Sequence, residues 1–376
     1  MSNKHLPHDL AQMQSLPLEA KEIMSSQRAV QWYEYWEEAV YVSFSGGKDS
    51  TVLADLCAKV CQKYGWTLYL LFVNTGLEYP EIQKFVRTFA EWLRSQYEIE
   101  VILDIVRPKM RFDEVIKKYG YPVISKEVSN TVAGARKNIK EKRYSLRLRQ
   151  LGVNAEEYGG LYDAGEYDYE KTVKKSKFQN TKWRFLIDAD FEVSERCCHV
   201  MKKRPAYLYE KQTGRKAIVG TLASESMTRH AAWLKKGCNA FEANRPTSQP
   251  LSFWTEQDIL RYLKKHKIPY CSVYGEIAYE YLPEQVRFDE ILNIHWVEGE
   301  PERLITTGCD RTGCIFCMFG CHLEKEPNRF QRLKETHPRQ YEYCIGGGEM
   351  VDGKWQPSKE GLGLGKVLDY IGVKYD

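Results

Sequence analysis

Features that define membrane-bound or exported proteins are scarce in this sequence. The longest uninterrupted apolar run, residues 68–73, is far shorter than the roughly 20 apolar residues that a membrane-spanning helix needs. Residues 1–27 are polar and lack the basic region and apolar core of a secretion signal. The formal net charge of +4 is too small to indicate a nucleic-acid partner by itself. We therefore expect a cytoplasmic protein that does not enter a membrane.

The composition is that of a globular protein with many cysteines. Its 376 residues, 43% of them hydrophobic, suffice for one large domain or two modest ones. Eleven cysteines without a secretion signal favour metal or redox chemistry over structural disulfides, and their odd number agrees with that interpretation.

Residues 40–53 predict a buried strand, a glycine turn and the start of a helix, which together form a phosphate-binding arrangement. Gly46 and Gly47 allow the backbone to turn sharply and to approach a ligand closely. Asp49, Ser50 and Thr51 can cap the free amides of the helix. An anion at the turn would meet N–H groups and the positive end of the helix dipole. The alternative interpretation is a chance Ser/Gly turn.

The turn is not a Walker loop, which would need glycine at Val42 and a hydroxyl at Asp49. Residues 45–50 instead resemble the PP-loop of the adenine nucleotide α-hydrolases. That resemblance implies binding of ATP and its cleavage between the α and β phosphates.

A strand–loop–helix unit recurs after this turn. Strands are expected at residues 68–73, 99–104 and 217–220, with a helix over about residues 80–94. This order predicts an α/β fold with a doubly wound, mostly parallel sheet and helices on both faces. Ligands of such sheets bind beyond the carboxyl ends of the strands, so a second turn can join the first at one nucleotide. The candidate residues of this second turn are Asn74, Thr75, Gly76 and Glu78.

We expect three consecutive parts in the chain. Residues 1–39 would form a helical segment, and residues 40–235 a nucleotide-binding α/β domain with an insertion around residues 136–184. Residues 236–376 would form a helical, cysteine-rich region that completes a metal site.

The insertion is strongly basic and rich in aromatic residues. Basic and aromatic side chains in alternation can bind phosphates and stack the bases of a polynucleotide. A solvated helical face followed by a loop is the plainer interpretation of the same residues. The residues concerned are Arg136, Lys137, Lys140, Lys142, Arg143, Arg147, Arg149, Tyr158, Tyr162, Tyr167, Tyr169 and Trp183.

The cysteines form two groups that are far apart in the sequence. Cys314 and Cys317 are separated by two residues and can aim both thiolates at one metal centre. Cys197 and Cys198 are adjacent, and adjacent side chains ordinarily point apart. A four-thiolate Zn²⁺ site and simple buried cysteines remain alternatives.

Several motifs, spread over residues 40–330, jointly resemble the phosphoadenylyl-sulfate and adenylyl-sulfate reductase family. They are Cys197-Cys198 with Lys203 and Pro205, Gly220 with Glu225-Ser226 and Arg229, the helix after Trp254, and the late Cys314-x-x-Cys317. The resemblance implies a Rossmann-like fold of the HUP type. It also implies a [4Fe–4S] cluster on Cys197, Cys198, Cys314 and Cys317, for which Cys238, Cys309, Cys321 and Cys344 are possible substitutes.

Two features depart from the assimilatory reductases of this family. The chain has no C-terminal Glu-Cys-Gly-Leu-His motif, and its last cysteine, Cys344, has no histidine shortly after it. The PP-loop is intact, whereas those reductases tend to degrade it. Both features favour ATP-dependent adenylyl activation, as in the sulfurtransferase of DNA phosphorothioation.

The resemblance to ATP-using members implies roles for single residues. Lys48 with the Gly46 and Gly47 amides would hold the pyrophosphate, and Asp49 would position Mg²⁺. Arg229 and Lys126 would neutralise charge at the α-phosphate. The remaining nucleotide-binding candidates are Ser45, Ser50, Thr51, Gly220, Glu225 and Ser226.

Three functional hypotheses follow. The first is an ATP-consuming sulfurtransferase that acts with a sulfur-donor or electron-donor protein on an acceptor, which can be DNA or RNA. The second is a sulfonucleotide reductase that uses an external thiol or Cys344. The third is a non-catalytic protein that binds nucleotide and nucleic acid. The sequence favours the first hypothesis and predicts neither the oligomeric state nor the role of the cluster.

Overall fold

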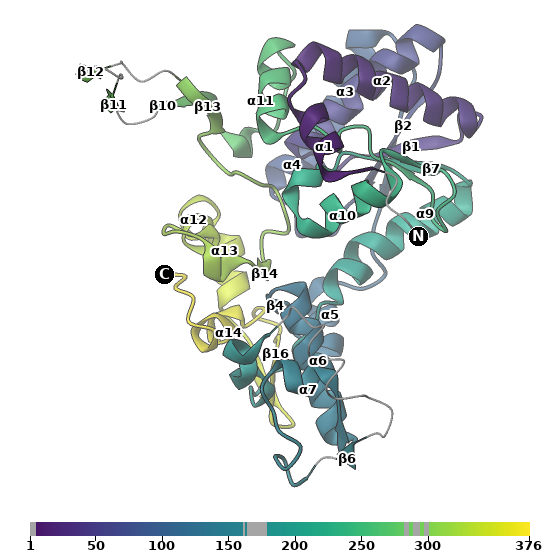
Figure 1. Cartoon of the computed structure of the whole chain (residues 1–376). Coiled ribbons are helices and arrows are strands. Elements are labelled where there is room, and N and C mark those ends of the chain that lie inside the picture. Colours follow the sequence, from purple (N-terminus) through teal and green to yellow (C-terminus); the bar gives the residue numbers. More distant parts are fainter. Residues whose placement is uncertain (1–4, 161, 164–178, 282–285, 289–293, 297–300) are drawn as a thin grey trace. The chain divides into compact units, whose positions relative to one another are not determined.

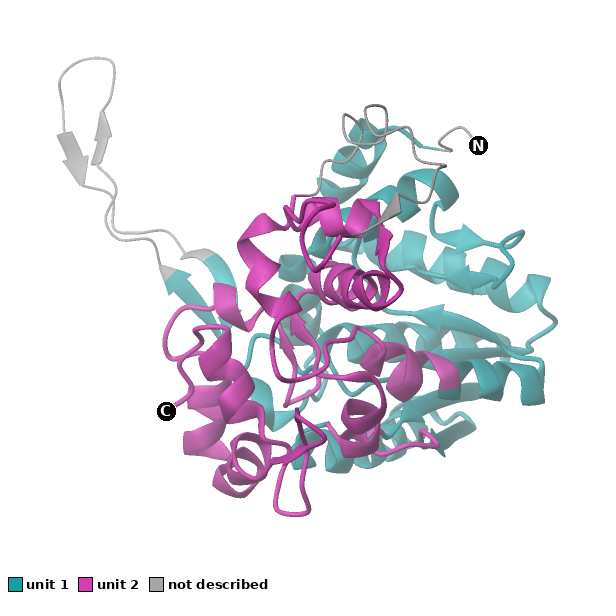
Figure 2. Ribbon diagram, turned by 90° about the horizontal axis from the view of Figure 1, so that it is seen from below, with its two compact units in different colours: residues 1–74, 78–107, 205–313 teal, residues 75–77, 108–204, 314–376 magenta. Residues whose placement is uncertain are grey.

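The structure is a computed structural model that describes residues 5–160, 162–163, 179–281, 286–288, 294–296 and 301–376. Tyr167 and Tyr169 of the expected insertion lie outside the described residues. The chain divides into two compact units, each built from separate stretches of sequence (Figure 2). Unit 1 comprises residues 1–74, 78–107 and 205–313, and unit 2 comprises residues 75–77, 108–204 and 314–376.

The centre of unit 1 is a six-stranded sheet with the strand order β3-β2-β1-β7-β9-β8. Its strands are β1 (Val40–Ser43), β2 (Leu68–Val73), β3 (Val101–Val106), β7 (Lys216–Val219), β8 (Asn239–Ala240) and β9 (Thr247–Ser248). All neighbours are parallel except β8 and β9, which are antiparallel. The mostly parallel α/β sheet predicted from the sequence is therefore confirmed.

Helices cover both faces of this sheet, as alternation along β1 shows. Val40 and Val42 point into the main core with α2, α3, α4 and α11, whereas Tyr41 packs on the other face against Tyr209 of α9. Such alternation is the period-two geometry of a strand that is buried on both sides. The helices of unit 1 are α1 (Pro7–Gln14), α2 (Leu18–Tyr35), α3 (Lys48–Tyr64), α4 (Pro80–Tyr97), α9 (Arg204–Thr213), α10 (Met227–Lys236) and α11 (Glu256–Lys265) (Figure 1).

The remainder of unit 1 consists of short elements. The 3-10 turns Ala223–Glu225 and Ser272–Tyr274 precede α10 and an antiparallel pair of strands. This pair is β10 (Ile277–Tyr281) with β13 (Pro301–Thr306), and β11 (Val286–Phe288) pairs with β12 (Ile294–Trp296).

Unit 2 is mainly helical with short strand pairs. Its helices are α5 (Phe112–Tyr119), α6 (Lys126–Lys140), α7 (Leu146–Gln150), α12 (Arg329–Thr336), α13 (Pro338–Ile345) and α14 (Leu364–Tyr370). Three strand pairs complete it: β4 (Val123–Ile124) with β14 (Met318–Phe319), β5 (Arg143–Tyr144) with β6 (Tyr162–Asp163), and β15 (Glu349–Val351) with β16 (Lys354–Gln356). The β4–β14 pair joins two distant stretches of sequence within this unit.

These units do not follow the consecutive division expected at residues 39/40 and 235/236. The N-terminal segment belongs to unit 1, because α2 buries Trp32 and Tyr33 completely in the core of the sheet. Residues 108–204 do not belong to the α/β unit 1, but form unit 2 together with residues 75–77 and 314–376. Long-range packing of this kind has no local sequence signal. Among the described residues, no helix is long and apolar enough to cross a membrane.

Candidate functional site

The candidate nucleotide site of unit 1 lies where the strand order of the sheet reverses. Strand β1 pairs with β2 on one side and with β7 on the other, so the loops after β1 and β7 leave neighbouring strands at the same edge of the sheet. Crevices at such reversals are the usual ligand sites of open α/β sheets. The two loops approach each other closely, since a Cβ atom at Gly220 would lie 3.0 Å from the Asp49 carbonyl oxygen. The structure thus brings together the PP-loop and Gly220.

Geometry requires glycine at position 46 of the PP-loop and leaves little room for a side chain at position 47. Gly46 has a φ of +74°, and a Cβ atom there would lie 2.9 Å from Cγ2 of Val86 and 3.0 Å from Cγ2 of Ile82. A side chain at this position would be strained by both the backbone angle and the contact. Gly47 is crowded from another direction, since its Cβ atom would lie 3.1 Å from Oγ1 of Thr312.

The hydroxyl groups of the PP-loop hold the turn itself. Ser50 and Thr51 donate hydrogen bonds to the Gly47 carbonyl oxygen at 2.8 and 3.0 Å, and the Ser45 N–H donates to Ser50 Oγ at 3.2 Å. The expectation that Ser50 and Thr51 cap the helix amides is therefore wrong, because the two hydroxyls bond back to the preceding carbonyl. The Asp49 carboxyl group, by contrast, accepts a hydrogen bond from its own backbone N–H in the first turn of α3. In the described part of the chain, no side-chain hydrogen bond caps α3 at Gly47. The start of α3 is therefore suited to an anion.

Lys48 is buried at the start of α3 and held by distant parts of unit 1. Its Nζ lies 2.5 Å from Oε1 of Glu256 and donates to the Asp310 carbonyl oxygen at 2.7 Å. Its backbone N–H donates to the hydroxyl of Tyr274 at 3.1 Å, and that hydroxyl is 2.7 Å from Oγ1 of Thr312. Lys48 is 6% exposed and Glu256 57% exposed, so the carboxylate occupies the solvent side of the ammonium group.

Asp49 has an altered electrostatic environment beside this lysine. Burial raises the pKa of the Asp49 carboxyl group, while the positive charge of Lys48 opposes that rise. Glu256 raises the same pKa and Arg311 lowers it, so three charged groups act on the Asp49 carboxyl group.

Two arginines share one carboxylate after β7. Glu225 forms an ion pair with Arg229, and its Oε1 lies 3.8 Å from Nη2 of Arg311. Burial lowers the pKa of Arg229, and the like charge of Arg311 lowers it further. Ser226 accepts a hydrogen bond from the Arg229 N–H at 3.3 Å and so caps α10. Glu225, Ser226 and Arg229 therefore form one local cluster.

The second expected turn is divided between the units. Asn74 and Glu78 belong to unit 1, whereas Thr75 and Gly76 belong to unit 2. Asn74 ends the sheet pairing of β2, because its N–H donates to the Val106 carbonyl oxygen at 2.9 Å. Thr75 Oγ1 accepts the Leu77 N–H at 3.2 Å.

Lys126 acts on the cysteine group of unit 2. It begins α6 in unit 2, and its positive charge and hydrogen bond act on Cys198. Its described neighbours therefore belong to the cysteine group.

Sequence reasoning missed several residues that contact the PP-loop. The missed residues are Glu256 and residues 310–312. Their contacts with Lys48 span more than 200 residues of sequence, a separation that no local pattern reveals. The one usable signal is the polar Asp310-Arg311-Thr312 tripeptide between two glycines.

Four cysteines of unit 2 line one small cavity: Cys197, Cys198, Cys314 and Cys317. Leu77, Phe112, Pro122, Met201 and Lys202 complete its lining. Cys197 and Cys198 directly precede the π-helical turn His199–Lys203, so their side chains diverge by a helical step rather than by the half-turn of a strand. This local geometry lets adjacent cysteines face one cavity.

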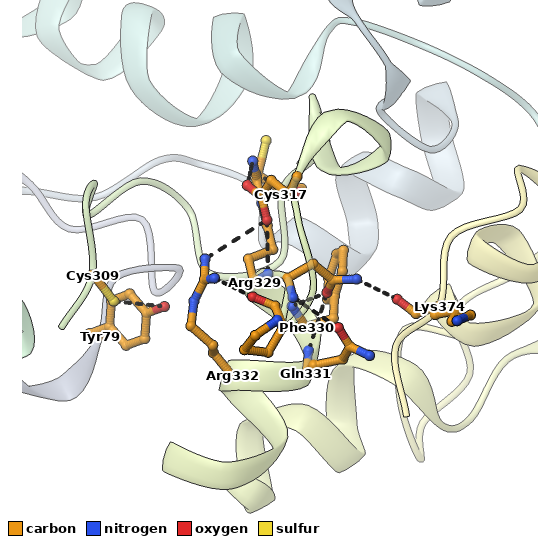
Figure 3. Close-up of polar contacts among 11 residues, drawn as sticks. Tyr79, Cys309, Cys317, Arg329, Phe330, Gln331, Arg332 and Lys374 are labelled. Carbon is orange, nitrogen blue, oxygen red and sulfur yellow. Dashed lines mark hydrogen bonds and ion pairs between the residues drawn. The ribbon is translucent and has the colours of Figure 1, made fainter. Parts of the chain in front are cut away.

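The CxxC segment is fixed by neighbours within unit 2. The Cys317 N–H donates to the Cys314 carbonyl oxygen at 3.1 Å, which closes a tight turn. Arg329 of α12 donates to the Cys317 carbonyl oxygen at 2.8 Å and is itself paired with Glu324 (Figure 3). The pairing of β14 with β4 anchors the residues that follow.

The thiols of this cavity interact electrostatically. A hydrogen bond from Cys197 lowers the pKa of Cys198, and Lys126 and Lys202 lower it further, whereas the same hydrogen bond raises the pKa of Cys197. Burial raises the pKa of Cys317. All eleven cysteines lie within the described residues, and none forms a disulfide.

The donor set suits a soft metal centre in its chemistry, since it consists of four thiols without oxygen ligands. The described residues nevertheless contain no group of three or more side chains in metal-holding geometry. The four thiols therefore line the same cavity, but their sulfur atoms are not arranged around one common metal position. Of the substitutes, Cys238 and Cys309 belong to unit 1, and the cavity lining includes neither Cys321 nor Cys344.

Some side chains of the basic segment at residues 136–149 stabilise unit 2 itself. Arg136 donates to the carbonyl oxygens of Leu186, Ala189 and Phe191 at 2.6–2.8 Å, so its guanidinium group stabilises a loop. Lys137 pairs with Glu141 at 3.6 Å. Arg136 is therefore not available for the expected polynucleotide-binding surface.

The fold and site define an α/β protein with a PP-loop. The candidate phosphate site lies where the strand order of the sheet reverses, and a group of cysteines lies in the other unit. The chain belongs to the phosphoadenosine phosphosulfate reductase domain family, whose model matches residues 39–155 and 155–319.

Two further similarities are weaker. An uncharacterized protein of Methanocaldococcus jannaschii, MJ0973, is 34% identical over 94 residues, which is 25% of this chain and 20% of that protein. The chain thus matches about a fifth of the length of that relative. The structure of NMN synthetase from Francisella tularensis is similar with a TM-score of 0.32 and 14% identity, over 68% of this chain and 73% of that chain. These values are too low to support a functional comparison.

Proposed function

We propose that the protein binds ATP at residues 45–51 of unit 1 and cleaves it between the α and β phosphates, so that an acceptor is activated by adenylylation. The observation that carries this proposal is the intact PP-loop at the reversal point of the sheet, with Lys48 at the start of α3. Arg229 and Arg311 add two positive charges near Asp49 in the same unit. Such a concentration of donors suits a polyphosphate.

The PP-loop supplies the binding of the pyrophosphate portion. The amides of Gly46 and Gly47 and the start of α3 would face the β and γ phosphates. Lys48 would exchange its contacts with Glu256 and the Asp310 carbonyl for phosphate oxygens. Asp49 would hold Mg²⁺, which neutralises charge on the leaving pyrophosphate when it is bound.

The reaction itself is a displacement at the α-phosphorus. An acceptor oxygen forms a bond to this phosphorus, the bond to the bridging oxygen of pyrophosphate breaks, and pyrophosphate leaves with the electron pair. Arg229 would stabilise the charge that develops there. A sulfur nucleophile can then replace the adenylylated oxygen with release of AMP, which is the sulfurtransferase part of the proposal.

The cysteine cavity supplies the second part of the proposed function. Cys197, Cys198, Cys314 and Cys317 would hold a [4Fe–4S] cluster, with Zn²⁺ as the alternative. When bound, a cluster of this kind supplies electron transfer or sulfur. Arg329 positions the CxxC turn through the Cys317 carbonyl.

A sulfonucleotide reductase is the second candidate, and family membership favours it. In that reaction a thiolate attacks the sulfur of an adenylyl sulfate. Cys344 is unsuited to this attack, because it is 0% exposed within α13 and burial raises the pKa of its thiol. A reductase of this structure would therefore need an external thiol.

DNA or RNA is the proposed acceptor class, with a sulfur-donor or electron-donor protein as a further partner. Several cations of the basic segment remain exposed after the loss of Arg136, namely Lys137, Lys140, Lys142, Arg143 and Arg147. Salt-sensitive binding of a duplex or single strand would support this acceptor. A non-catalytic binding protein would show that binding without any turnover.

The test compares nucleotides on the full-length chain. α,β-Methylene-ATP with Mg²⁺ should bind, and the Lys48→Ala variant should weaken its binding by more than about tenfold, because a charge-assisted contact is lost. Lys63→Ala is the matched control, since Lys63 is exposed at the other end of the same helix. Binding of adenylyl sulfate with sulfite release, but no binding of the ATP analogue, would replace this proposal with the reductase.

A further inference from the structure

Three consecutive residues, Asp310 to Thr312, contact three different parts of the candidate nucleotide site. We term residues 310–312 the strap. The Asp310 carbonyl oxygen accepts a hydrogen bond from Lys48 Nζ at 2.7 Å, and Arg311 Nη2 lies 3.8 Å from Glu225 Oε1. The Thr312 hydroxyl is 2.7 Å from the Tyr274 hydroxyl. The strap has no helix or strand of its own, so these contacts determine its position.

The strap contacts the groups that a polyphosphate would use. A Cβ atom at Gly47 would lie 3.1 Å from Thr312 Oγ1, so the strap adjoins the glycine turn directly. Tyr274 connects Thr312 to the first amide of α3, because its hydroxyl accepts the Lys48 N–H at 3.1 Å. An anion that binds at this turn must therefore rearrange the contacts of the strap.

Arg311 is the cation of this cluster that is best placed to receive a ligand. Its side chain is 71% exposed, whereas those of Arg229 and Lys48 are 42% and 6% exposed. Its ion pair with Glu225 is long, at 3.8 Å, and its charge acts on both Asp49 and Arg229. A guanidinium group matches two phosphate oxygens at once and is more weakly hydrated than an ammonium group.

The strap continues directly into the CxxC segment. Gly313 follows it, and a Cβ atom at Gly313 would meet no described atom within 4 Å, so this residue is loosely packed. Cys314 comes next and lines the cysteine cavity together with Cys317. Gly313 is also the last residue of unit 1, and Cys314 resumes unit 2. A change in the strap thus reaches the backbone of Cys314 through two peptide bonds.

We propose that the strap binds the phosphates of ATP through Arg311 and that its rearrangement alters the surroundings of Cys314 and Cys317. The proposal rests on the nucleotide binding proposed above and adds a phosphate ligand and a physical link to the cysteine centre. By linkage, the state of the cysteine centre also changes the affinity for the nucleotide.

The first experiment titrates the full-length chain with α,β-methylene-ATP and Mg²⁺. Arg311→Ala should weaken binding about tenfold, the effect expected for one charge-assisted contact to phosphate, and should leave the binding of adenosine unchanged. Arg87→Ala is the matched control, because Arg87 is an exposed arginine on α4 of the same unit. Equal affinities of Arg311→Ala and the wild type for the ATP analogue would overturn the role of Arg311.

The second experiment measures the alkylation of Cys314 and Cys317 by iodoacetamide in the metal-free full-length chain, by mass spectrometry of their peptides. Saturating α,β-methylene-ATP should change at least one rate constant about threefold or more in the wild type. Adenosine should not change it, and Arg311→Ala should lose the change even at saturation. Circular dichroism checks that the metal-free chain and each variant remain folded.

The outcomes separate the two proposals. A wild type that binds the ATP analogue but shows unchanged alkylation of both cysteines overturns the link through the strap and leaves the proposed function intact. A folded wild type that does not bind the analogue overturns the proposed function and the inference that rests on it. Thr312→Val, which keeps Arg311 but removes the hydroxyl contact with Tyr274, should reduce the change in alkylation at saturating ATP analogue, and an undiminished change would overturn the part of Thr312 in the link.

Discussion

Glu256→Gln should increase the affinity of the protein for α,β-methylene-ATP, because the carboxylate competes with phosphate for Lys48. The pair is short, at 2.5 Å, but Glu256 is 57% exposed, so water screens the interaction. Ion pairs of this exposure contribute about 0.2–1 kcal/mol. If a phosphate oxygen must displace the carboxylate, ligand binding breaks the Lys48–Glu256 ion pair. In Glu256→Gln this ion pair is absent, so binding no longer has to offset its free energy. At most about 1 kcal/mol corresponds to roughly fivefold tighter binding.

Isothermal titration at low salt measures this change directly, and the gain should shrink as salt screens the exposed pair. Glu19→Gln is the matched control, since Glu19 pairs with Lys265 at 2.7 Å elsewhere in unit 1. That variant should bind the analogue as the wild type does. Weaker binding by Glu256→Gln would refute the reasoning and would indicate that Glu256 assists the ligand, for example through Mg²⁺.

Three further predictions concern stability, each measured by chemical denaturation. Gly46→Ala should lose about 2–4 kcal/mol, since it adds left-handed strain to a 2.9 Å contact with Val86; a loss below 1 kcal/mol would contradict that geometry. Lys21→Met should lose about 3–5 kcal/mol, because it leaves Asp258, its partner at 2.7 Å, charged and buried; an unchanged midpoint would show that Asp258 is satisfied without it. Arg136→Ala should lose about 3 kcal/mol from three unpaired carbonyls while nucleic-acid binding by the folded variant stays within about twofold; a larger fall in binding would restore Arg136 to the basic surface.

The central sheet was predictable because its signals are local. The apolar runs of β1, β2 and β3 and the turn at Gly46 and Gly47 depend on neighbours in sequence, and the structure confirms the strands and their parallel pairing. The order in which β7 joins β1 also follows the usual rules of doubly wound sheets. The location of the candidate site could therefore be inferred before the structure was known.

The neighbours of Lys48 could not be predicted in the same way. Glu256 begins a capped amphipathic helix, and nothing in that local pattern indicates that its carboxylate contacts a lysine 208 positions earlier. The effect of Lys126 on Cys198 is a second long-range relation that no local pattern indicates. The compact units have no local signal either, because residues 108–204 pack with residues 314–376 through long-range contacts.

The charges around the PP-loop explain why the intact loop matters for the choice of ligand. Within the described residues, the cations Lys48, Arg229 and Arg311 pair with two carboxylates, Glu225 and Glu256. Asp49 adds a third carboxyl group whose pKa burial raises, so a divalent cation or a nearby ammonium group favours its charged form. The proposed triphosphate with Mg²⁺ would balance these charges, since its oxygens would replace the carboxylates at the cations and Mg²⁺ would favour the charged form of Asp49. An adenylyl sulfate has no β,γ-pyrophosphate to displace Glu256 from Lys48, so Glu256→Gln should affect its binding much less than that of the ATP analogue.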